Sequence, residues 1–253
     1  MHILITNDDG VRAPGLQQLK IQLQQYGYQI SVVAPNGQRS ASSHAMTIGK
    51  PLYCRQWGQG DIAVSGTPVD CVKLAMEKFL VHQRPQLIIS GINDGFNLGS
   101  DVLYSGTVSA AMEGPYYQVP AIAVSMEKWD EMRGKKVISV LHEVIQRLII
   151  GGKFPGILNI NIPSKGEISW DRIRLATQAV QLYDNVILEK KDQDNSRYYI
   201  IEGEADLQTA MVGTDIDMIR SGFISLTPLQ WQQMATGSFL TIKEELQKKT
   251  CNL

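Results

Sequence analysis

Residues 2–35 read HILITNDDGVRAPGLQQLKIQLQQYGYQISVVAP, and this stretch decides the fold. A short apolar run at His2–Thr6 is followed by a polar turn, and a second apolar run covers Ile30–Ala34. Between the two runs, apolar residues recur at roughly helical spacing, at Leu16, Leu19, Ile21 and Leu23. The pattern predicts a βαβ unit, in which a helix joins two parallel strands.

The same alternation continues through the next 130 residues or so. Further apolar runs predict strands at Ile62–Ser65, Leu87–Ser90, Ala121–Ser125 and Ile157–Ile162. Helical patterns lie between them, at Pro68–Phe79, Thr107–Glu113 and Trp129–Ile150. Strands that alternate with helices indicate an α/β fold with a mostly parallel sheet and helices on both faces. In such a sheet, ligands bind beyond the carboxyl ends of the strands.

The pattern then changes to β-branched and aromatic stretches without long helices. Val180–Glu189 and Arg197–Ile201 flank a polar turn, which predicts a long β-hairpin. Phe239–Lys249 predicts an amphipathic helix with a basic end. We therefore expect a core in residues 1–163, and a second part in residues 164–253 that completes the sheet and carries the hairpin and the C-terminal helix.

The amino-acid composition favours a small-molecule ligand over a nucleic acid. Lys and Arg number 24 against 25 Asp and Glu, and the formal net charge of the 253 residues is -1. Without a basic excess, nucleic-acid binding through phosphate neutralisation is not indicated, and a small-molecule ligand is expected. The 3 cysteines show no C-x-x-C spacing, which argues against a disulfide framework or a zinc knuckle. No apolar run reaches membrane-spanning length and the N-terminus shows no secretory pattern, so we expect a cytoplasmic protein that does not associate with membranes.

The turn after the first strand, Asn7-Asp8-Asp9-Gly10, is the first candidate site. Two adjacent carboxylates repel each other unless a cation lies between them, and hard divalent cations bind oxygen ligands of this kind. An isolated Asp-Asp-Gly is more often a polar turn that caps the following helix. Its place in a βαβ unit favours a ligand site, because this turn lies at the edge where ligands bind.

A second polar loop, Gln38–His44, follows the second strand. Its hydroxyls, among them that of Ser40, and the Arg39 guanidinium could coordinate a metal ion or hold a phosphate. Serine-rich loops are also common as solvated turns. We interpret His44 as a residue that forms hydrogen bonds within the loop and not as a metal ligand or an acid.

The most informative stretch is Ser90–Gly114. Regular glycines after a buried strand suggest backbone held close to a ligand, with Asn93 and Asn97 as neutral contacts. Ser105-Gly106-Thr107 then opens a helix, and the free N–H groups at a helix start bind anions. A loop of this length within a compact domain usually has a function.

Several known enzyme templates are absent. The chain lacks G-x-x-x-x-G-K-[ST] of P-loop proteins, and its first βα turn lacks the G-x-G-x-x-G of nicotinamide-binding domains. Asn7 stands where a dehalogenase-type phosphatase would carry its nucleophilic aspartate. The 4 histidines do not pair at metal-ligand spacing, and G-x-S-x-G is missing.

Taken together, the segments closely resemble the SurE (survival protein E) family of metal-dependent nucleotidases. The resemblance runs through Ile5–Gly15, Ala34–Ser40, Gly66–Cys71, Ser90–Gly114, Leu158–Pro163, Gly213–Asp215 and Ser225–Leu229. Ser90–Gly114 is its most specific part.

This resemblance implies a Rossmann-like core that hydrolyses nucleoside 5′-monophosphates to nucleoside and inorganic phosphate, with 3′-monophosphates as a further substrate class. Carried over by matching positions, the metal ligands are Asp8, Asp9, Ser40 and Asn93. They would hold one divalent ion per subunit, Mg²⁺ or Mn²⁺, and Asp8 and Asp9 are the expected catalytic carboxylates. The phosphate-contacting positions are Asn97, Ser105, Gly106 and Thr107.

Two alternatives stay open for the function. The same site could serve a broader acid phosphatase or exopolyphosphatase, or it could belong to a nucleotide-binding module without turnover. All the expected ligand positions are filled, which favours an active enzyme. Some members of the family carry histidine or aspartate after Thr227-Pro228-Leu229, where this chain reads Gln230–Met234. Many members also have glycine where Ser43 stands here.

The resemblance also implies self-association as a homodimer or homotetramer. In the family, the hairpin and the C-terminal segment are exchanged between subunits. This agrees with the physical expectation that an isolated two-stranded hairpin is marginally stable in water.

Overall fold

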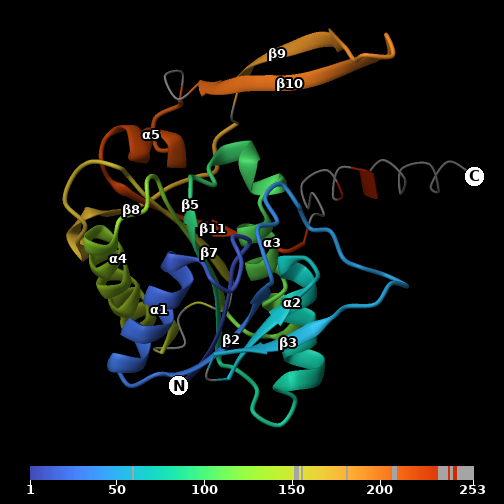
Figure 1. The fold of residues 1–253 in the computed structure, drawn as a ribbon. Helices are drawn as coiled ribbons and strands as arrows, with labels where there is room; N and C mark the ends of the chain where they lie inside the picture. The colour runs from blue at the N-terminus through green and yellow to red at the C-terminus, as the bar shows by residue number, and fades with distance from the viewer. Residues whose placement is uncertain are drawn as a thin grey trace, which may run out of the picture.

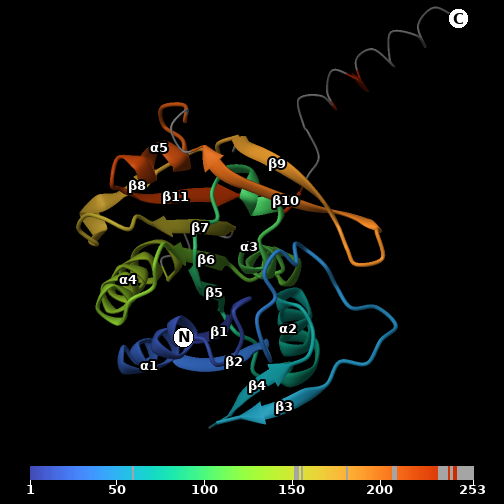
Figure 2. The ribbon, with the colours of Figure 1, turned by 45° about the horizontal axis from the view of Figure 1, so that its top comes forward.

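The computed structural model describes the chain except residues 59, 151–153, 155, 181, 207–209, 233–238, 240–241 and 244–253. Its main sheet has the strand order β3-β4-β2-β1-β5-β6-β7-β11-β8 (Figures 1 and 2). The strands are β1 (His2–Thr6), β2 (Gln29–Pro35), β3 (Cys54–Trp57), β4 (Asp61–Val64), β5 (Leu87–Asp94), β6 (Ala121–Met126), β7 (Ile157–Ile162), β8 (Ile173–Leu175) and β11 (Ile224–Leu229). The six central strands β4, β2, β1, β5, β6 and β7 are parallel. At the two sides, β3 runs antiparallel to β4 and β11 runs antiparallel to β7, while β8 is parallel to β11.

Helices cover both faces of the sheet, as predicted, and Figure 2 shows the two layers edge-on. One face carries α1 (Pro14–Gln25), α4 (Glu131–Val144) and the π-helical turn η4 (Ile145–Ile149). The other face carries α2 (Pro68–Leu74), the π-helical turn η1 (Ala75–Phe79) and α3 (Gly106–Met112). Shorter elements are η2 (Gly99–Leu103), η3 (Pro115–Tyr117), η5 (Trp170–Arg172) and α5 (Asp215–Arg220).

Each layer has its own apolar core against the sheet. Leu16 and Leu19 of α1 pack with Ile5 of β1 on one side. Val72 of α2 and Val108 of α3 pack on the other side. Because the apolar residues of β1 alternate between the two cores, both faces of this strand are buried, as in other parallel sheets.

The strand order reverses at the centre of the sheet, and this reversal marks the edge at which a ligand site is expected. From β1 the chain moves outward to β2 and β4, and then returns to β5 on the opposite side of β1. A crevice opens at such a switch point, beyond the carboxyl ends of the two central strands. The turns after β1, β2 and β5 all reach this edge.

The element boundaries confirm some predictions and correct others. The strands predicted at His2–Thr6 and Ile157–Ile162 have those bounds. The strand predicted at Leu87–Ser90 extends to Asp94, because its pairing with β6 resumes after a register shift between Ser90 and Asn93. The two longer predicted helices end in π-helical turns. The sequence interpretation did not assign strands β3 and β8 or helix α5, which are short, and it also missed β11, which is as long as β7.

The predicted hairpin is present as a separate two-stranded sheet. Strands β9 (Leu182–Lys191) and β10 (Arg197–Asp206) pair antiparallel and project away from the main sheet (Figure 1). The predicted C-terminal helix, Phe239–Lys249, lies largely outside the described residues.

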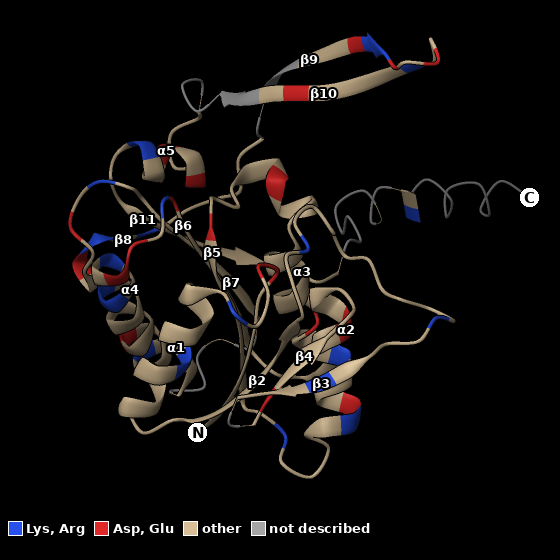
Figure 3. Ribbon diagram, viewed as in Figure 1, with Lys and Arg blue, Asp and Glu red and all other residues tan. Residues whose placement is uncertain are grey.

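Charged residues are interspersed along the helices. In Figure 3, basic and acidic positions lie close together on α2 and on α4. Among the described residues, no helix has the length and apolarity needed to cross a membrane.

Candidate functional site

The turn after β1 is fixed by its own side chains and by close backbone contact. The Asn7 amide group accepts from Gly10 N–H at 3.0 Å and donates to the Gly10 carbonyl at 3.0 Å. Gly10 has a φ of 103°, and a Cβ there would lie 3.0 Å from Cα of Gly37. Helix α1 begins after Ala13, which makes no side-chain cap bond. The acids of the turn therefore do not cap this helix and are available for other contacts.

Asp8 and Asp9 form a pair of carboxylates at the switch point. Asp8 is buried, and the Thr107 hydroxyl donates to its Oδ1. Burial raises the pKa of Asp8, although the hydrogen bond from Thr107 opposes the shift. Burial, followed by the negative charge of Asp8, raises the pKa of Asp9 to about 6. In the described part of the chain, neither carboxylate forms an ion pair with a basic side chain. Such an uncompensated pair favours a bound cation.

Ser40 comes to this edge on the loop after β2. The backbone N–H of Arg39 donates to the Asp8 carbonyl at 2.6 Å, which joins the loop to the turn. The Arg39 guanidinium donates to the carbonyl of Ser65 at 2.9 Å. The Ser40 hydroxyl accepts from the Gln38 amide at 2.9 Å. These contacts bring a hydroxyl oxygen to the same edge as the two carboxylates.

Asn93 lies in β5, next to its last residue, and Asn97 lies in the segment that follows the strand. The Asn93 amide nitrogen donates to the Gly95 carbonyl at 2.8 Å, and its oxygen remains as a candidate ligand. Asn97 is buried, and its backbone N–H donates to Oδ1 of Asn161 at 2.8 Å. Its carbonyl accepts from Asn159 at 2.8 Å, and its side-chain nitrogen donates to Ser125 at 2.7 Å. Asn97 is therefore held in one orientation from two neighbouring strands.

The start of α3 completes the site. Ser105 is the N-cap residue, and its hydroxyl accepts from Val108 N–H at 3.0 Å. A Cβ on Gly106 would lie 2.6 Å from Oγ of Ser42 and 3.0 Å from Cβ of Asp8. A larger residue at this position would force Ser42 and Asp8 to shift.

These elements surround a cavity of about 880 Å³. Its lining includes six of the predicted residues, namely Asp8, Asp9, Ser40, Asn93, Asn97 and Ser105. Gly106 and Thr107 lie behind this lining, against Asp8. The structure thus brings together side chains that are up to 97 positions apart in the sequence, from Asp8 to Ser105.

Several residues of the cavity were missed by the sequence interpretation. Asp94, Asp101 and Tyr104 lie between predicted residues, and Ile201 and Glu202 of β10 close the cavity from the hairpin side. Nothing local in the hairpin sequence indicates this position. The supporting role of Asn159 and Asn161 could have been predicted from the sequence, because two asparagines alternate with apolar residues in the strand Ile157–Ile162.

The donor atoms suit a hard divalent cation. The candidate ligands are two carboxylates, one hydroxyl and one amide oxygen, which Mg²⁺ and Mn²⁺ prefer over the nitrogen and sulfur ligands typical of zinc. Among the described residues, no group of three or more His, Cys, Asp or Glu is gathered for a metal ion. A cation here would have few protein ligands and would keep positions for water and substrate.

The chain is similar in sequence to several known proteins. The 5′-nucleotidase SurE of Desulfitobacterium hafniense (strain DSM 10664 / DCB-2) is 42% identical over 233 residues, covering 90% of each chain. That of Histophilus somni (strain 2336) is 36% identical and covers 98% of this chain and 100% of its own. The 5′/3′-nucleotidase SurE of Wigglesworthia glossinidia brevipalpis is 36% identical over 235 residues, which cover 90% of this chain and 91% of its own.

The fold comparison gives the same result. The crystal structure of the SurE protein from Aquifex aeolicus superposes with a TM-score of 0.83 at 31% sequence identity, covering 96% of this chain and 99% of the other. The sequence profile of the family described as "Survival protein SurE" matches residues 3–185. The family profile covers most of the chain, and both the relatives and the solved structure carry the same family name. The chain therefore belongs to the SurE family.

Proposed function

We propose that this protein is a 5′-nucleotidase, which hydrolyses nucleoside 5′-monophosphates to nucleoside and inorganic phosphate. The observation that carries the proposal is the cavity in which Asp8 and Asp9 meet Ser40 and Asn93, beside the start of α3. The names of the relatives support the same activity. Nucleoside 3′-monophosphates are a second proposed substrate class, which the name of the Wigglesworthia relative supports.

Asp8, Asp9, Ser40 and Asn93 are the residues that we propose to hold one divalent cation per subunit, Mg²⁺ or Mn²⁺. Their fit rests on the uncompensated charge of the paired carboxylates and on the all-oxygen donor set. When bound, such a cation neutralises phosphate charge and lowers the pKa of a bound water.

The remaining chemistry belongs to the side chains around the phosphate. Asp8 orients the attacking water or accepts its proton. Ser105, the N–H of Gly106 and Thr107 stabilise the charge that spreads over the oxygens of the transferred group. Thr107 also holds Asp8 through its hydroxyl. Asn97, fixed by its neighbours on two strands, presents a pre-oriented polar group to the substrate.

The test is a phosphate-release assay on a panel of nucleoside monophosphates and polyphosphate, with Mn²⁺ and with a chelator. We expect hydrolysis of 5′-monophosphates that stops with the chelator and returns with Mn²⁺ or Mg²⁺. A preference for polyphosphate or for simple phosphate esters would favour the broader phosphatase. Nucleotide binding without phosphate release would favour the non-catalytic alternative, and full turnover in metal-stripped protein would exclude the cation from the reaction.

We also propose that residues 164–253 mediate self-association into a dimer or tetramer, while residues 1–163 form the catalytic core. The hairpin stands apart from the main sheet and exposes apolar side chains on both strands, including Ile187 at 65%, Tyr199 at 57% and Ile201 at 77%. A two-stranded hairpin with these exposures requires a partner for stability. An identical subunit provides one through a symmetric interface.

Replacing Leu182–Tyr198 with a short Gly-Ser turn should lower the oligomeric state measured by light scattering. It should also reduce activity, since β10 borders the cavity. A wild-type protein that is monomeric at micromolar concentration would contradict this proposal.

A cytoplasmic location is proposed as well, with a nucleotide as the ligand and neither a nucleic acid nor a membrane as a partner. The free thiols of Cys54 and Cys71 support a reducing compartment.

A further inference from the structure

The loop that carries Ser40 is held from outside the cavity. This Ser40 loop, residues 38–50, has no regular secondary structure, and most of its residues are exposed. Two of its non-glycine residues, Ala41 and Ser43, have φ angles of 54° and 50°. Left-handed backbone at such residues persists where the surroundings over-determine it. Contacts with α2 and α3 hold the loop in this conformation.

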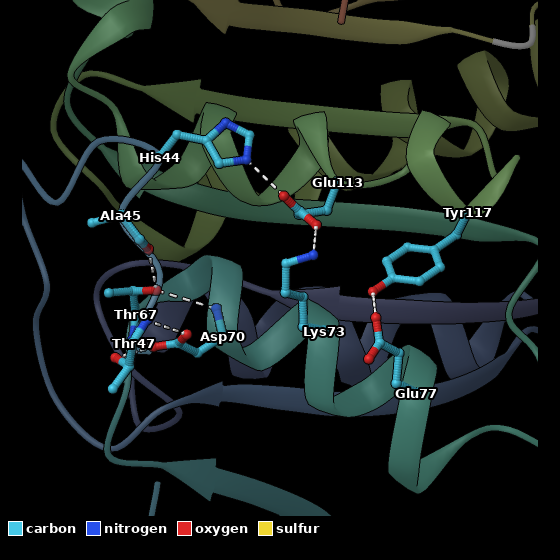
Figure 4. Close-up of polar contacts among 9 residues, drawn as sticks. All are labelled: His44, Ala45, Thr47, Thr67, Asp70, Lys73, Glu77, Glu113 and Tyr117. Atoms are coloured by element: carbon cyan, nitrogen blue, oxygen red, sulfur yellow. Dashed lines mark hydrogen bonds and ion pairs between the residues drawn. The ribbon is translucent and has the colours of Figure 1, made fainter. Parts of the chain in front are cut away.

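The first anchor is the start of α2, drawn in Figure 4. Thr67 and Asp70 form a capping box. The same Asp70 carboxylate accepts from the Thr47 backbone N–H at 2.8 Å and from its hydroxyl at 2.6 Å. The Thr67 hydroxyl donates to the carbonyl of Ala45 at 2.7 Å. The residues that begin the helix thus also fix the far end of the Ser40 loop.

The second anchor is Glu113, at the end of α3. Its Oε1 accepts from Nε2 of His44 at 2.6 Å, and its Oε2 pairs with Nζ of Lys73 at 3.1 Å (Figure 4). The Glu113 side chain is 7% exposed, whereas that of His44 is 40% exposed. Burial raises the pKa of Glu113, but the hydrogen bonds from His44 and Lys73 outweigh this effect and the pKa is lowered. A buried carboxylate therefore joins the loop, α2 and α3.

A third contact fixes the loop to the other end of α3. The Ser43 hydroxyl donates to the Leu103 carbonyl at 2.7 Å, and its N–H donates to the Tyr104 carbonyl at 3.1 Å. Since Ser105 caps α3 immediately after these residues, Ser43 and His44 tie the loop to both ends of the helix. The loop that carries Ser40 and the helix that begins at the phosphate position are thereby held as one unit.

We propose that His44, held by Glu113, is a positioning residue that fixes the Ser40 side of the divalent-cation site. The proposal rests on the proposed function, because it takes Ser40 as a ligand. His44 does not line the cavity, and it acts through the backbone of residues 40–44, where the two left-handed residues lie. Partners that hydrogen-bond metal ligands directly typically change metal affinity 10- to 100-fold when they are removed, and we expect His44, which acts through the backbone, to fall at the low end of this range.

The matched variants are His44→Ala and Tyr117→Phe. The Tyr117 hydroxyl donates to Glu77 at 2.5 Å on the same face of the sheet, just beyond the ends of α3 and α2, and this contact does not involve the loop (Figure 4). Binding of Mn²⁺ to metal-stripped protein is measured by electron paramagnetic resonance without substrate, alongside thermal unfolding and nucleotide hydrolysis. We expect His44→Ala to weaken Mn²⁺ binding about tenfold. Tyr117→Phe should leave it unchanged, and His44→Gln, which keeps a donor for Glu113, should recover most of the affinity.

The outcomes are distinguishable. A folded His44→Ala variant with wild-type Mn²⁺ affinity would overturn the proposal, and so would equal losses of affinity in His44→Ala and Tyr117→Phe. If His44→Ala does not fold, the second variant is Glu113→Ala, which removes the acceptor of the His44 bond; wild-type affinity in that folded protein would also overturn the proposal. A wild type that binds Mn²⁺ but hydrolyses no nucleotide would refute the proposed function and leave the comparison of affinities valid.

Discussion

The proposed cation site is built from two regions that are held in different ways. The turn with Asp8 and Asp9 is fixed within four residues, by the bonds of Asn7 to Gly10, and its first residues are buried at the end of a central strand. The Ser40 loop is mostly exposed and is fixed by side chains from α2 and α3. One half of the site is therefore fixed by its own bonds and by the core of the sheet. The other half is held by side chains that do not line the cavity.

A substitution in the turn should reduce activity more than a substitution that only loosens the Ser40 loop. We expect Asp9→Asn to lower kcat/KM for a nucleoside 5′-monophosphate by more than about 100-fold, beyond the range found for residues that only support a ligand. Without metal the variant should unfold at a higher temperature than the wild type, because the repulsion between Asp8 and Asp9 is removed. Calorimetry in a chelator and steady-state kinetics with Mn²⁺ check the two expectations. A variant with lower activity and lower thermal stability would indicate a structural role for Asp9.

Gly106 tests both regions at once, because it lies between them. A side chain at this position would meet Ser42 of the loop at 2.6 Å and Asp8 of the turn at 3.0 Å. Gly106→Val should therefore weaken competitive inhibition by inorganic phosphate by about tenfold or more, which corresponds to ~1.4 kcal/mol. Circular dichroism provides the control for folding. A folded variant with wild-type phosphate inhibition would place the phosphate elsewhere in the cavity.

The same difference explains which parts of the site were predictable. The role of the turn could be predicted because Asn7-Asp8-Asp9-Gly10 directly follows a strand, and parallel strands end at a shared edge of the sheet. The anchors of the Ser40 loop were not, since His44 and Glu113 are 69 positions apart and meet only after α3 packs on the sheet. His44 was expected to form hydrogen bonds within its loop, and this was wrong about the partner, because the bond goes to Glu113 at the end of α3, which no pattern in the sequence indicates.

The fold shows a similar division. Strand β1 is an uninterrupted apolar run bounded by a polar turn, and its bounds were predicted. Strand β8 has three residues, and its pairing with β11 is a long-range contact that no local pattern specifies. The π-helical turns that end α2 and α4 continue the apolar pattern of each helix, so the sequence predicted one longer helix in both places.

Loss of the hydrogen bonds within the turn should have a smaller effect, on the stability of the fold. Asn7→Ala removes both contacts with Gly10 and leaves a buried N–H and a buried carbonyl without these partners. We expect the free energy of unfolding to fall by about 1–3 kcal/mol. Urea denaturation measures this change, with Gln38→Ala as a control on the exposed loop. Equal stability of the two variants would show that the turn is held by the core alone.

The smallest expected effect concerns the charge at the end of α3. His44 and Lys73 lower the pKa of Glu113 below its ordinary value of about 4.3. A carboxyl whose pKa is lower in the folded than in the unfolded protein stabilises the fold above the unfolded pKa, and this contribution is lost as the pH falls through the folded value. Glu113→Gln should therefore be less stable than the wild type at pH 7, by about 1 kcal/mol after allowance for solvent screening. The difference should shrink below about pH 4. Urea denaturation of both proteins from pH 3 to pH 7 checks the sign, and a difference that is independent of pH would mean that the packing of Glu113, and not its charge, holds the loop to the helix.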